Sequence, residues 1–193
     1  GVVAVVQHNA AFGIYHDYWV AGMSAVVPLG FELPDISGKP YLNKSDTPKH
    51  SKKRIGLRWQ GGTQFEHEHH KRVPYELMFE AVKGVDAEFV SLQRDEGVDA
   101  RPDWVSEVSL DSWDDTQKAV SSCDLVISAC TSVSHLAGAM GVDTWVITPV
   151  LPYFLYAQDG ENTPYYDSMK LFRQKEFGKW EAPFELISKR LAA

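Results

Sequence analysis

Residues 124–148 read DLVISACTSVSHLAGAMGVDTWVIT, and this stretch decides the fold of the chain. The apolar runs 124–128 and 144–148 are typical of buried strands. Between them, 131–140 is rich in small and apolar residues and predicts a helix that ends at Gly141. Because the strands are joined by a crossover helix with short connections, they are expected to run parallel. The stretch therefore predicts a βαβ unit.

The same alternation continues on both sides of this unit. Further strands are expected at 55–59, 88–92 and 169–172, and further helices at 75–82, 113–123 and 181–191. We predict a Rossmann-like α/β fold, a three-layer α/β/α arrangement in which helices cover both faces of a parallel sheet. Ligands of such sheets bind beyond the carboxyl ends of the strands, so the loops after Trp59, Leu92 and Ser128 are the candidate sites.

Composition excludes several classes of protein. A hydrophobic fraction of 44% and a charged fraction of 23% are typical of a globular chain. With 19 Lys+Arg against 26 Asp+Glu, the net charge of -7 argues against binding to nucleic acid or to an anionic membrane. Cys123 and Cys130 form no disulfide framework, which favours a reducing, cytoplasmic location. No apolar run reaches the ~18–20 residues of a membrane span.

The character of the sequence changes near residue 50. Residues 1–50 are aromatic, punctuated by Pro and Gly, and show no long helical period. We interpret them as a connector and the remnant of a missing N-terminal domain, and residues 51–193 as the Rossmann-like domain. Because about fifty residues are too few for a second domain of this kind, the chain is expected to be a fragment or a truncated protein.

The start of the 131–140 helix is the sharpest candidate site. The backbone N–H groups and the dipole of a helix N-terminus favour an anion, and the hydroxyls of Thr131 and Ser132 add two donors. These residues therefore predict a phosphate site. The alternative is that Thr131 or Ser132 only caps the helix.

Two further residues near this helix have reactive side chains. His135 lies one turn into the helix, where it faces a ligand or is buried in the core with one ring nitrogen bonded to the backbone. Cys130 precedes the helix, where a thiolate is stabilised, and a nucleophilic cysteine would use His135 as its base.

The loop after Trp59 offers both backbone access and positive charge. Gln60 and Gly61 begin this loop, and glycine lets the backbone approach a ligand, although a plain turn explains it equally well. Lys71 and Arg72, just before the next helix, are placed to neutralise a diphosphate. After the 88–92 strand, Gln93 is placed to contact a ribose or a base, or else belongs to a solvated turn.

The same loop contains His67, His69 and His70, which raises the alternative of a metal site and a metal hydrolase. No Cys or second His pair with the spacing of a known zinc site accompanies them. A solvated polar loop explains the histidines without a metal, and no metal ligand is assigned.

Taken in order, these segments resemble the C-terminal half of the heptosyltransferase-like glycosyltransferases (glycosyltransferase family nine), especially the type found with tetratricopeptide repeats. The residues that carry the resemblance are 55–59 with Gly61, Lys71 and Arg72, 89–93, 124–128, Thr131 with 135–141, Trp145, Tyr165 and Tyr166, 168–174 and Trp180. This resemblance covers nearly the whole chain.

The resemblance implies the donor-binding half of a GT-B glycosyltransferase, metal-independent and inverting, whose only small ligand is a nucleotide diphosphate sugar. It implies that Thr131 and Ser132 bind the diphosphate and that Lys71 or Arg72 stabilises the leaving nucleotide. Gln93 and the turn at Gln60 and Gly61 would line the nucleoside. The acceptor and usually the base would come from a missing N-terminal domain. That domain, or tetratricopeptide repeats, would belong to the full-length protein.

One position departs from the family. Cys130 stands where these enzymes usually have Asp. The departure leaves open a second hypothesis, a degenerate nucleotide-binding module that keeps the fold without catalysis.

Overall fold

The computed structural model describes residues 13–15, 17–20, 25, 27–48, 50–63, 68–94 and 96–193. The chain divides into two compact units, Gly1–Ile36 and Ser37–Ala193. The described part of the first unit contains a short 3₁₀ turn, η2 (Leu33–Asp35), and exposes large side chains such as Tyr18 and Trp19. The strands and α-helices of the described chain all belong to the second unit.

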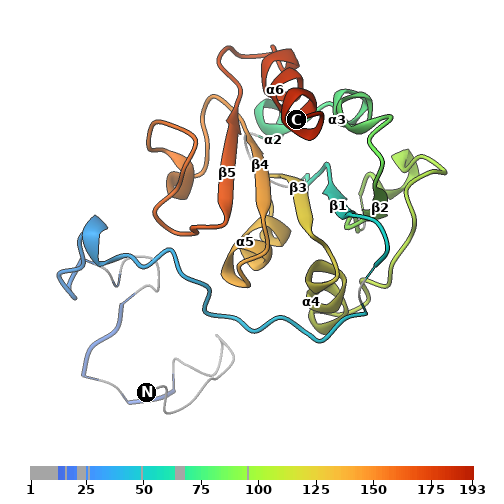
Figure 1. Ribbon diagram of the computed structural model, residues 1–193. Coiled ribbons are helices and arrows are strands. Elements are labelled where there is room, and N and C mark those ends of the chain that lie inside the picture. The colour runs from blue at the N-terminus through green and yellow to red at the C-terminus, as the bar shows by residue number, and fades with distance from the viewer. Residues whose placement is uncertain are drawn as a thin grey trace. The chain divides into compact units, whose positions relative to one another are not determined.

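Five parallel strands form one sheet in the second unit (Figure 1). Their order across the sheet is β2 (Glu88–Ser91), β1 (Arg54–Arg58), β3 (Leu125–Ala129), β4 (Thr144–Thr148) and β5 (Met169–Arg173). In the centre, Gly56 of β1 pairs with Val90 on one side and Val126 on the other. This 2-1-3-4-5 order confirms the predicted α/β, Rossmann-like class. The order reverses between β1 and β3, the switch point at which such sheets bind ligands.

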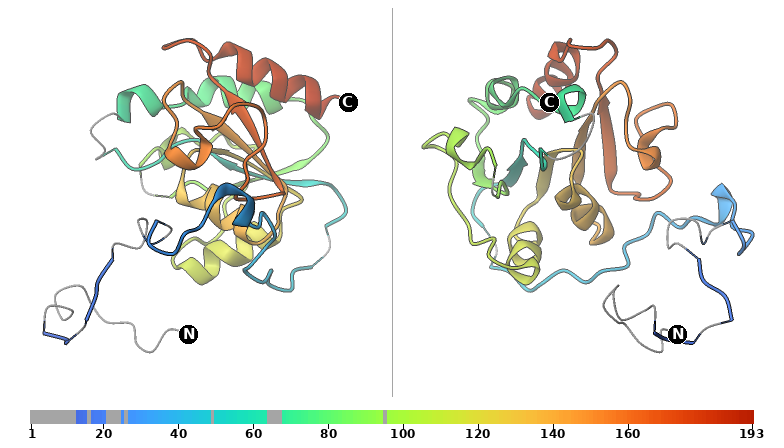
Figure 2. Two further views of the ribbon diagram at one scale, coloured as in Figure 1. Left: turned by 90° about the vertical axis from the view of Figure 1, so that its left-hand side faces the viewer. Right: turned by 180° about the vertical axis from the view of Figure 1, so that it is seen from behind.

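Helices cover both faces of the sheet (Figure 2). They are α2 (Glu68–Lys71), α3 (Tyr75–Val82), α4 (Trp113–Ser121), α5 (Ser132–Ala139) and α6 (Glu181–Leu191), with the 3₁₀ turns η3 (Val98–Ala100) and η4 (Phe154–Tyr156) in the loops. On one face α3 packs against α6, and on the other α4 packs against α5. Within the described residues, no helix has the length and the apolar character needed to cross a membrane.

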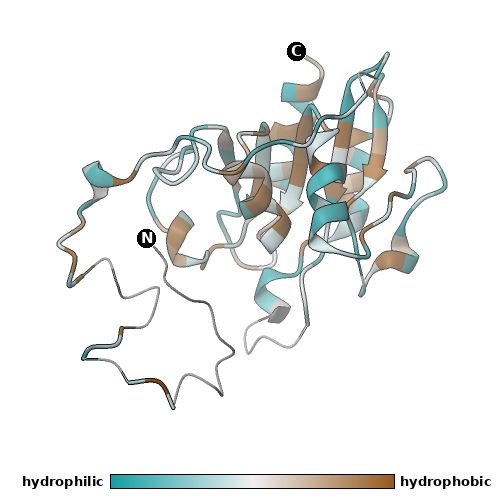
Figure 3. Cartoon of the chain, turned by 90° about the horizontal axis from the view of Figure 1, so that it is seen from below, coloured by the Kyte–Doolittle hydropathy of each residue, from teal (hydrophilic) through white to brown (hydrophobic). Residues whose placement is uncertain are grey.

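Each face of the sheet buries its own apolar cluster, because successive side chains of a strand point to opposite faces. Leu125 and Ile127 of β3 belong to the cluster under α3 and α6, whereas Val126 belongs to the cluster under α4 and α5. Figure 3 shows the apolar residues concentrated along the strands. The three predicted layers are therefore present.

The ends of the elements follow local signals. Ser112 caps α4 by accepting a hydrogen bond from the Asp115 N–H at 3.1 Å. The strand expected at 55–59 is shifted by one residue, so Trp59 lies just beyond β1. There its indole N–H donates to the Gly97 carbonyl at 2.9 Å. Trp59 is thus the first residue of the loop that follows β1.

The stretch after Ser37, which the sequence places in the connector, belongs to the second unit. The Tyr41 N–H donates to the carbonyl of Ala139 at the end of α5, at 2.9 Å. Further along, the Ser45 N–H donates to the hydroxyl of Ser121 at the end of α4, also at 2.9 Å. Helices α4 and α5 end at the edge of the sheet opposite the carboxyl ends of the strands. Because this stretch contacts the ends of both helices, it follows that edge (Figure 1).

Candidate functional site

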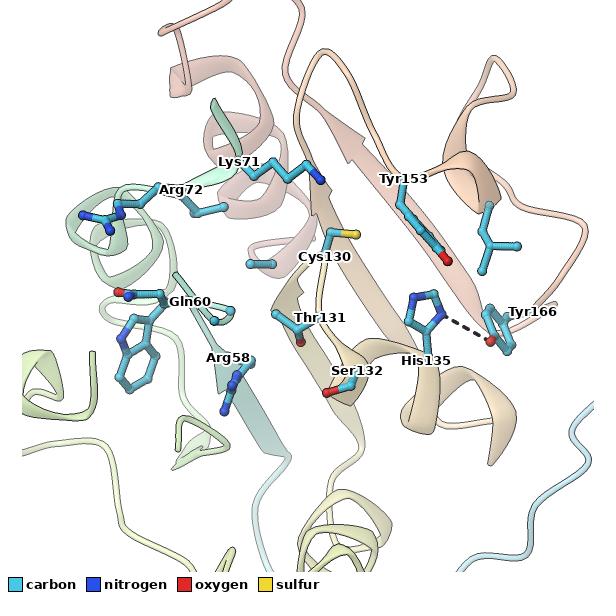
Figure 4. A pocket seen from close by; sticks show the side chains of 16 residues that line it. Arg58, Gln60, Lys71, Arg72, Cys130, Thr131, Ser132, His135, Tyr153 and Tyr166 are labelled. Carbon is cyan, nitrogen blue, oxygen red and sulfur yellow. Dashed lines mark hydrogen bonds between the residues drawn. The ribbon is translucent and has the colours of Figure 1, made fainter. Parts of the chain in front are cut away.

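A cavity of about 630 Å³ opens at the carboxyl ends of β1 and β3, at the switch point of the sheet (Figure 4). The structure brings together on its wall nearly all of the residues that the sequence singled out. These are Gln60, Gly61, Lys71, Arg72, Cys130, Thr131, Ser132 and His135. Segments far apart in the sequence thus meet in one place, as the fold predicts.

Helix α5 begins on the wall of this cavity. Thr131 is its N-cap residue but makes no side-chain capping bond. Its hydroxyl instead lies 3.2 Å from the hydroxyl of Ser128, while Ser134 donates to the Thr131 carbonyl at 2.7 Å. Capping therefore does not explain Thr131. The first turn of α5, with its partial positive charge, lies where it can bind an anion.

Three cationic side chains line the same cavity as the start of α5. Arg58 is the last residue of β1, Lys71 ends α2, and Arg72 follows it. The Arg58 guanidinium is oriented by donation to the Leu92 carbonyl at 2.9 Å. Among the described residues that line the cavity, none is Asp or Glu. In a chain of net charge -7, this concentration of positive charge is a local property of the cavity.

The other half of the cavity is aromatic and neutral. His135 stacks on Tyr156, with ring centroids 5.5 Å apart, and its Nδ1 lies 3.3 Å from the Tyr166 hydroxyl (Figure 4). Burial lowers the pKa of His135, so the imidazole is uncharged at neutral pH. Burial also raises the pKa of Tyr156 and of Tyr166, which stay phenols. With Tyr153 and Leu155, this wall offers ring faces and neutral hydrogen-bonding groups.

Tyr166 owes its place to a glycine of α5. A Cβ atom on Gly138 would come within 2.6 Å of Cγ in the Tyr166 ring. The ring therefore rests directly on the helix backbone, one turn from His135. Gly138 thus makes room for the tyrosine.

Cys130 lies on the wall but is not activated. Burial raises the pKa of its thiol to about 11, although the charge of Lys71 opposes this rise. A cysteine nucleophile reacts as the thiolate, which a pKa of about 11 makes scarce at neutral pH. This environment does not favour the nucleophile interpretation.

Gln93 differs from the other predicted residues because it does not line the cavity. Its side chain is 3% exposed and joins the loops that follow β1 and β2. Its Oε1 accepts from the N–H groups of Trp59 and Gln60 at 3.2 and 3.0 Å. Its Nε2 donates to the carbonyls of Gln60 and Glu96 at 3.1 and 2.6 Å. The side-chain amide of Gln93 is hydrogen-bonded to the protein backbone, so Gln93 stabilises the Gln60–Gly61 turn and does not line the cavity.

The histidine loop is only partly described. His67 lies outside the described residues, and of His69 the backbone alone is described. The ring of His70 contacts the ring of Phe177, with centroids 5.4 Å apart. Within the described residues, no group of three His, Cys, Asp or Glu side chains is placed to hold a metal ion.

The predictions from the sequence did not include Arg58, Tyr153 and Tyr166 among the site residues. Arg58 could have been found as the polar end of an apolar strand. The tyrosines lie in the loop between β4 and β5, which has no periodicity to guide a prediction. A second cavity of about 140 Å³ shares Arg58 and Ser132 with the first and is also lined by Arg94 and Trp113. Arg58 and Ser132 therefore lie on the walls of both cavities.

Comparisons with protein-family models, with curated proteins and with solved structures found no match to this chain.

Proposed function

We propose that this chain binds a nucleoside diphosphate sugar and is the donor-binding half of a glycosyltransferase. The observation that carries the proposal is the divided cavity. Arg58, Lys71 and Arg72 line one part of the cavity together with the start of α5, and a neutral wall around His135 forms the other part. A diphosphate requires the cationic half, whereas a sugar, with its hydroxyl groups and apolar ring face, fits the aromatic half.

The second cavity supplies a direction for the nucleoside. Because Arg58 and Ser132 line both cavities, a diphosphate held between them has the smaller cavity on one side and His135 on the other. Trp113 in the smaller cavity offers an aromatic face, and Arg94 a planar cation, to a base and its ribose. We place the nucleoside toward Trp113 and the sugar toward His135.

The reaction that follows is an inverting transfer. The acceptor oxygen forms a bond to the anomeric carbon as the bond from that carbon to the diphosphate oxygen breaks, and the acceptor proton passes to a base. The leaving nucleoside diphosphate gains negative charge, which Lys71, Arg72 and the start of α5 stabilise. These groups stabilise that charge without a metal. The acceptor and the base come from another domain, or from tetratricopeptide repeats, of the same protein. The free cysteines Cys123 and Cys130 suit a cytoplasmic location.

A second candidate is a nucleotide-binding module without catalysis. It is favoured by Cys130, which is an uncharged thiol where the resembled enzymes usually have a carboxylate. Both candidates bind a nucleotide, and they differ in whether the bound donor reacts.

Isothermal titration calorimetry with ADP, UDP, GDP, CDP and their sugar conjugates tests the binding. Replacing Lys71 and Arg72 together by Met should weaken binding by about 100-fold at low salt, since each lost charge-assisted contact contributes ~1.5 kcal/mol. The matched control is Lys83→Met, which removes an exposed cation from the end of α3. The absence of binding by the wild-type protein at millimolar nucleotide would overturn the proposal.

Turnover separates the two candidates. The donor that binds most tightly is incubated with the protein, and release of nucleoside diphosphate is followed with and without added acceptor sugars. Slow release that requires Lys71 and Arg72 supports the transferase half. Tight binding without release in the presence of the complementary domain or partner would support the binding module.

A further inference from the structure

Arg173 is the last residue of β5 and makes an unusual set of contacts with the loop that precedes this strand. Its Nε donates to the Gly160 carbonyl and its Nη1 to the Tyr156 carbonyl, both at 2.7 Å. Its Nη2 donates to the Gln158 carbonyl. One guanidinium thus fixes three alternate carbonyls of a single loop, a geometry that the planar fork of arginine permits and an ammonium does not.

The loop that Arg173 holds forms part of the aromatic half of the cavity. Residues Tyr153 and Leu155 line the cavity, and Tyr156 stacks on His135. Only a little of this loop is regular, namely the single 3₁₀ turn η4. The positions of the side chains that face the cavity therefore depend on the tertiary contacts that fix the backbone of this loop.

We propose that Arg173 is a positioning residue that holds the 153–160 loop against the cavity and thereby determines which glycosyl groups fit beside His135. The role in selecting glycosyl groups rests on the proposed function. The role of Arg173 in holding the loop is independent of it. Arg173 is not on the cavity wall and touches no bound sugar. It acts through Tyr153, Leu155 and Tyr156.

Cys130 reports on the loop without any ligand. It packs with Leu155 against the cluster that contains Tyr156, and the Tyr153 N–H hydrogen-bonds to its sulfur. Cys130 is partly exposed on the cavity wall, and release of the loop exposes its thiol further. Cys123 is buried in the separate cluster under α4 and α5, so it becomes reactive only when the whole domain opens.

The experiment compares Arg173→Met and Arg173→Lys with the wild-type protein. Alkylation of Cys130 and of Cys123 by iodoacetamide at pH 8 is followed by peptide mass spectrometry. In the Met variant, we expect Cys130 to be alkylated about tenfold faster than in the wild type. This ratio corresponds to a free energy of local loop opening that is lower by ~1.4 kcal/mol. Cys123 should remain unreacted. The alkylation rate of Cys130 in the Lys variant should lie between the rates in the wild type and the Met variant. The matched control Arg190→Met removes a nearby arginine that pairs with Glu161, and it should leave Cys130 unchanged.

Calorimetry supplies the functional measurement. The variants should bind the nucleoside diphosphate as the wild type does and should lose the discrimination among its sugar conjugates. Unchanged Cys130 reactivity, or equal acceleration at both cysteines, would overturn the positioning role, because the arginine would then be dispensable or would support the fold in general. Unaltered sugar discrimination by a variant with an open loop would overturn the specificity role. If the wild-type protein binds no nucleotide, the proposed function fails, while the thiol measurement still decides whether Arg173 holds the loop.

Discussion

Replacing Gln93 by Leu should destabilise the domain by about 3 kcal/mol. The substitution removes four hydrogen bonds of 3.2 Å or less, two accepted from the N–H groups of Trp59 and Gln60 and two donated to the carbonyls of Gln60 and Glu96. A typical bond contributes ~0.5–1.5 kcal/mol, so the four together amount to about 2–6 kcal/mol. Water can reach part of the exposed loop after the change, which places the expected loss in the lower half of that range.

Gln174 provides a matched control because it is also a buried glutamine that follows a strand. It is 4% exposed, its Oε1 accepts one bond from the Val150 N–H at 3.2 Å, and its Nε2 has no hydrogen-bond partner. Gln174→Leu removes one bond and also an unsatisfied donor. We expect it to cost at most about 1 kcal/mol.

Urea unfolding, followed by tryptophan fluorescence, measures both variants. With an m-value of ~2 kcal/mol/M, the Gln93 variant should unfold at about 1.5 M less urea than the wild type. The Gln174 variant should differ from the wild type by no more than about 0.5 M. A Gln93 variant with wild-type stability and weakened nucleotide binding would refute the reasoning, since Gln93 would then contact the ligand as the sequence suggested.

Three further changes test the aromatic half and the smaller cavity. Gly138→Ala should destabilise the domain by about 1–3 kcal/mol in urea, because the new methyl group collides with the Tyr166 ring. Stability should fall as the pH drops below about 6.5, because burial lowers the folded-state pKa of His135 and the unfolded chain then binds the proton more tightly. A His135→Phe variant should lose less stability between pH 7.5 and 5 than the wild type, and an equal loss would contradict this cause. Trp113→Ala should weaken nucleoside diphosphate binding in calorimetry by about tenfold through lost stacking, while inorganic pyrophosphate binding stays unchanged.

The sheet was predictable because its signals are local. The apolar runs around Val126 and Val146 and the turn at Gly141 each indicate an element within a few residues. Once the strands are known to be parallel, their carboxyl ends must share an edge. For this reason the sequence alone places Lys71 and Thr131 in one site, although they are far apart along the chain.

The residues that sequence reasoning misplaced depend on contacts across the chain. Whether the Gln93 amide faces a ligand or the backbone is decided by the loop after β1, which the local sequence does not encode. Tyr153 and Tyr166 lie in a loop without periodicity, and the Tyr166 ring lies where Gly138 leaves room for it. A guanidinium that binds loop carbonyls leaves no pattern in the sequence.

The division of the cavity has an evolutionary consequence. Its cationic half is built from Arg58, the residues that end α2 and the first turn of α5, whereas much of its aromatic half comes from the 149–168 connection between two neighbouring strands. Changes in that single connection can therefore diversify one half while the other is inherited unaltered. A lineage with this fold could acquire new ligand preferences by exchanging one short coding segment, provided that the arginine that contacts the loop carbonyls is kept.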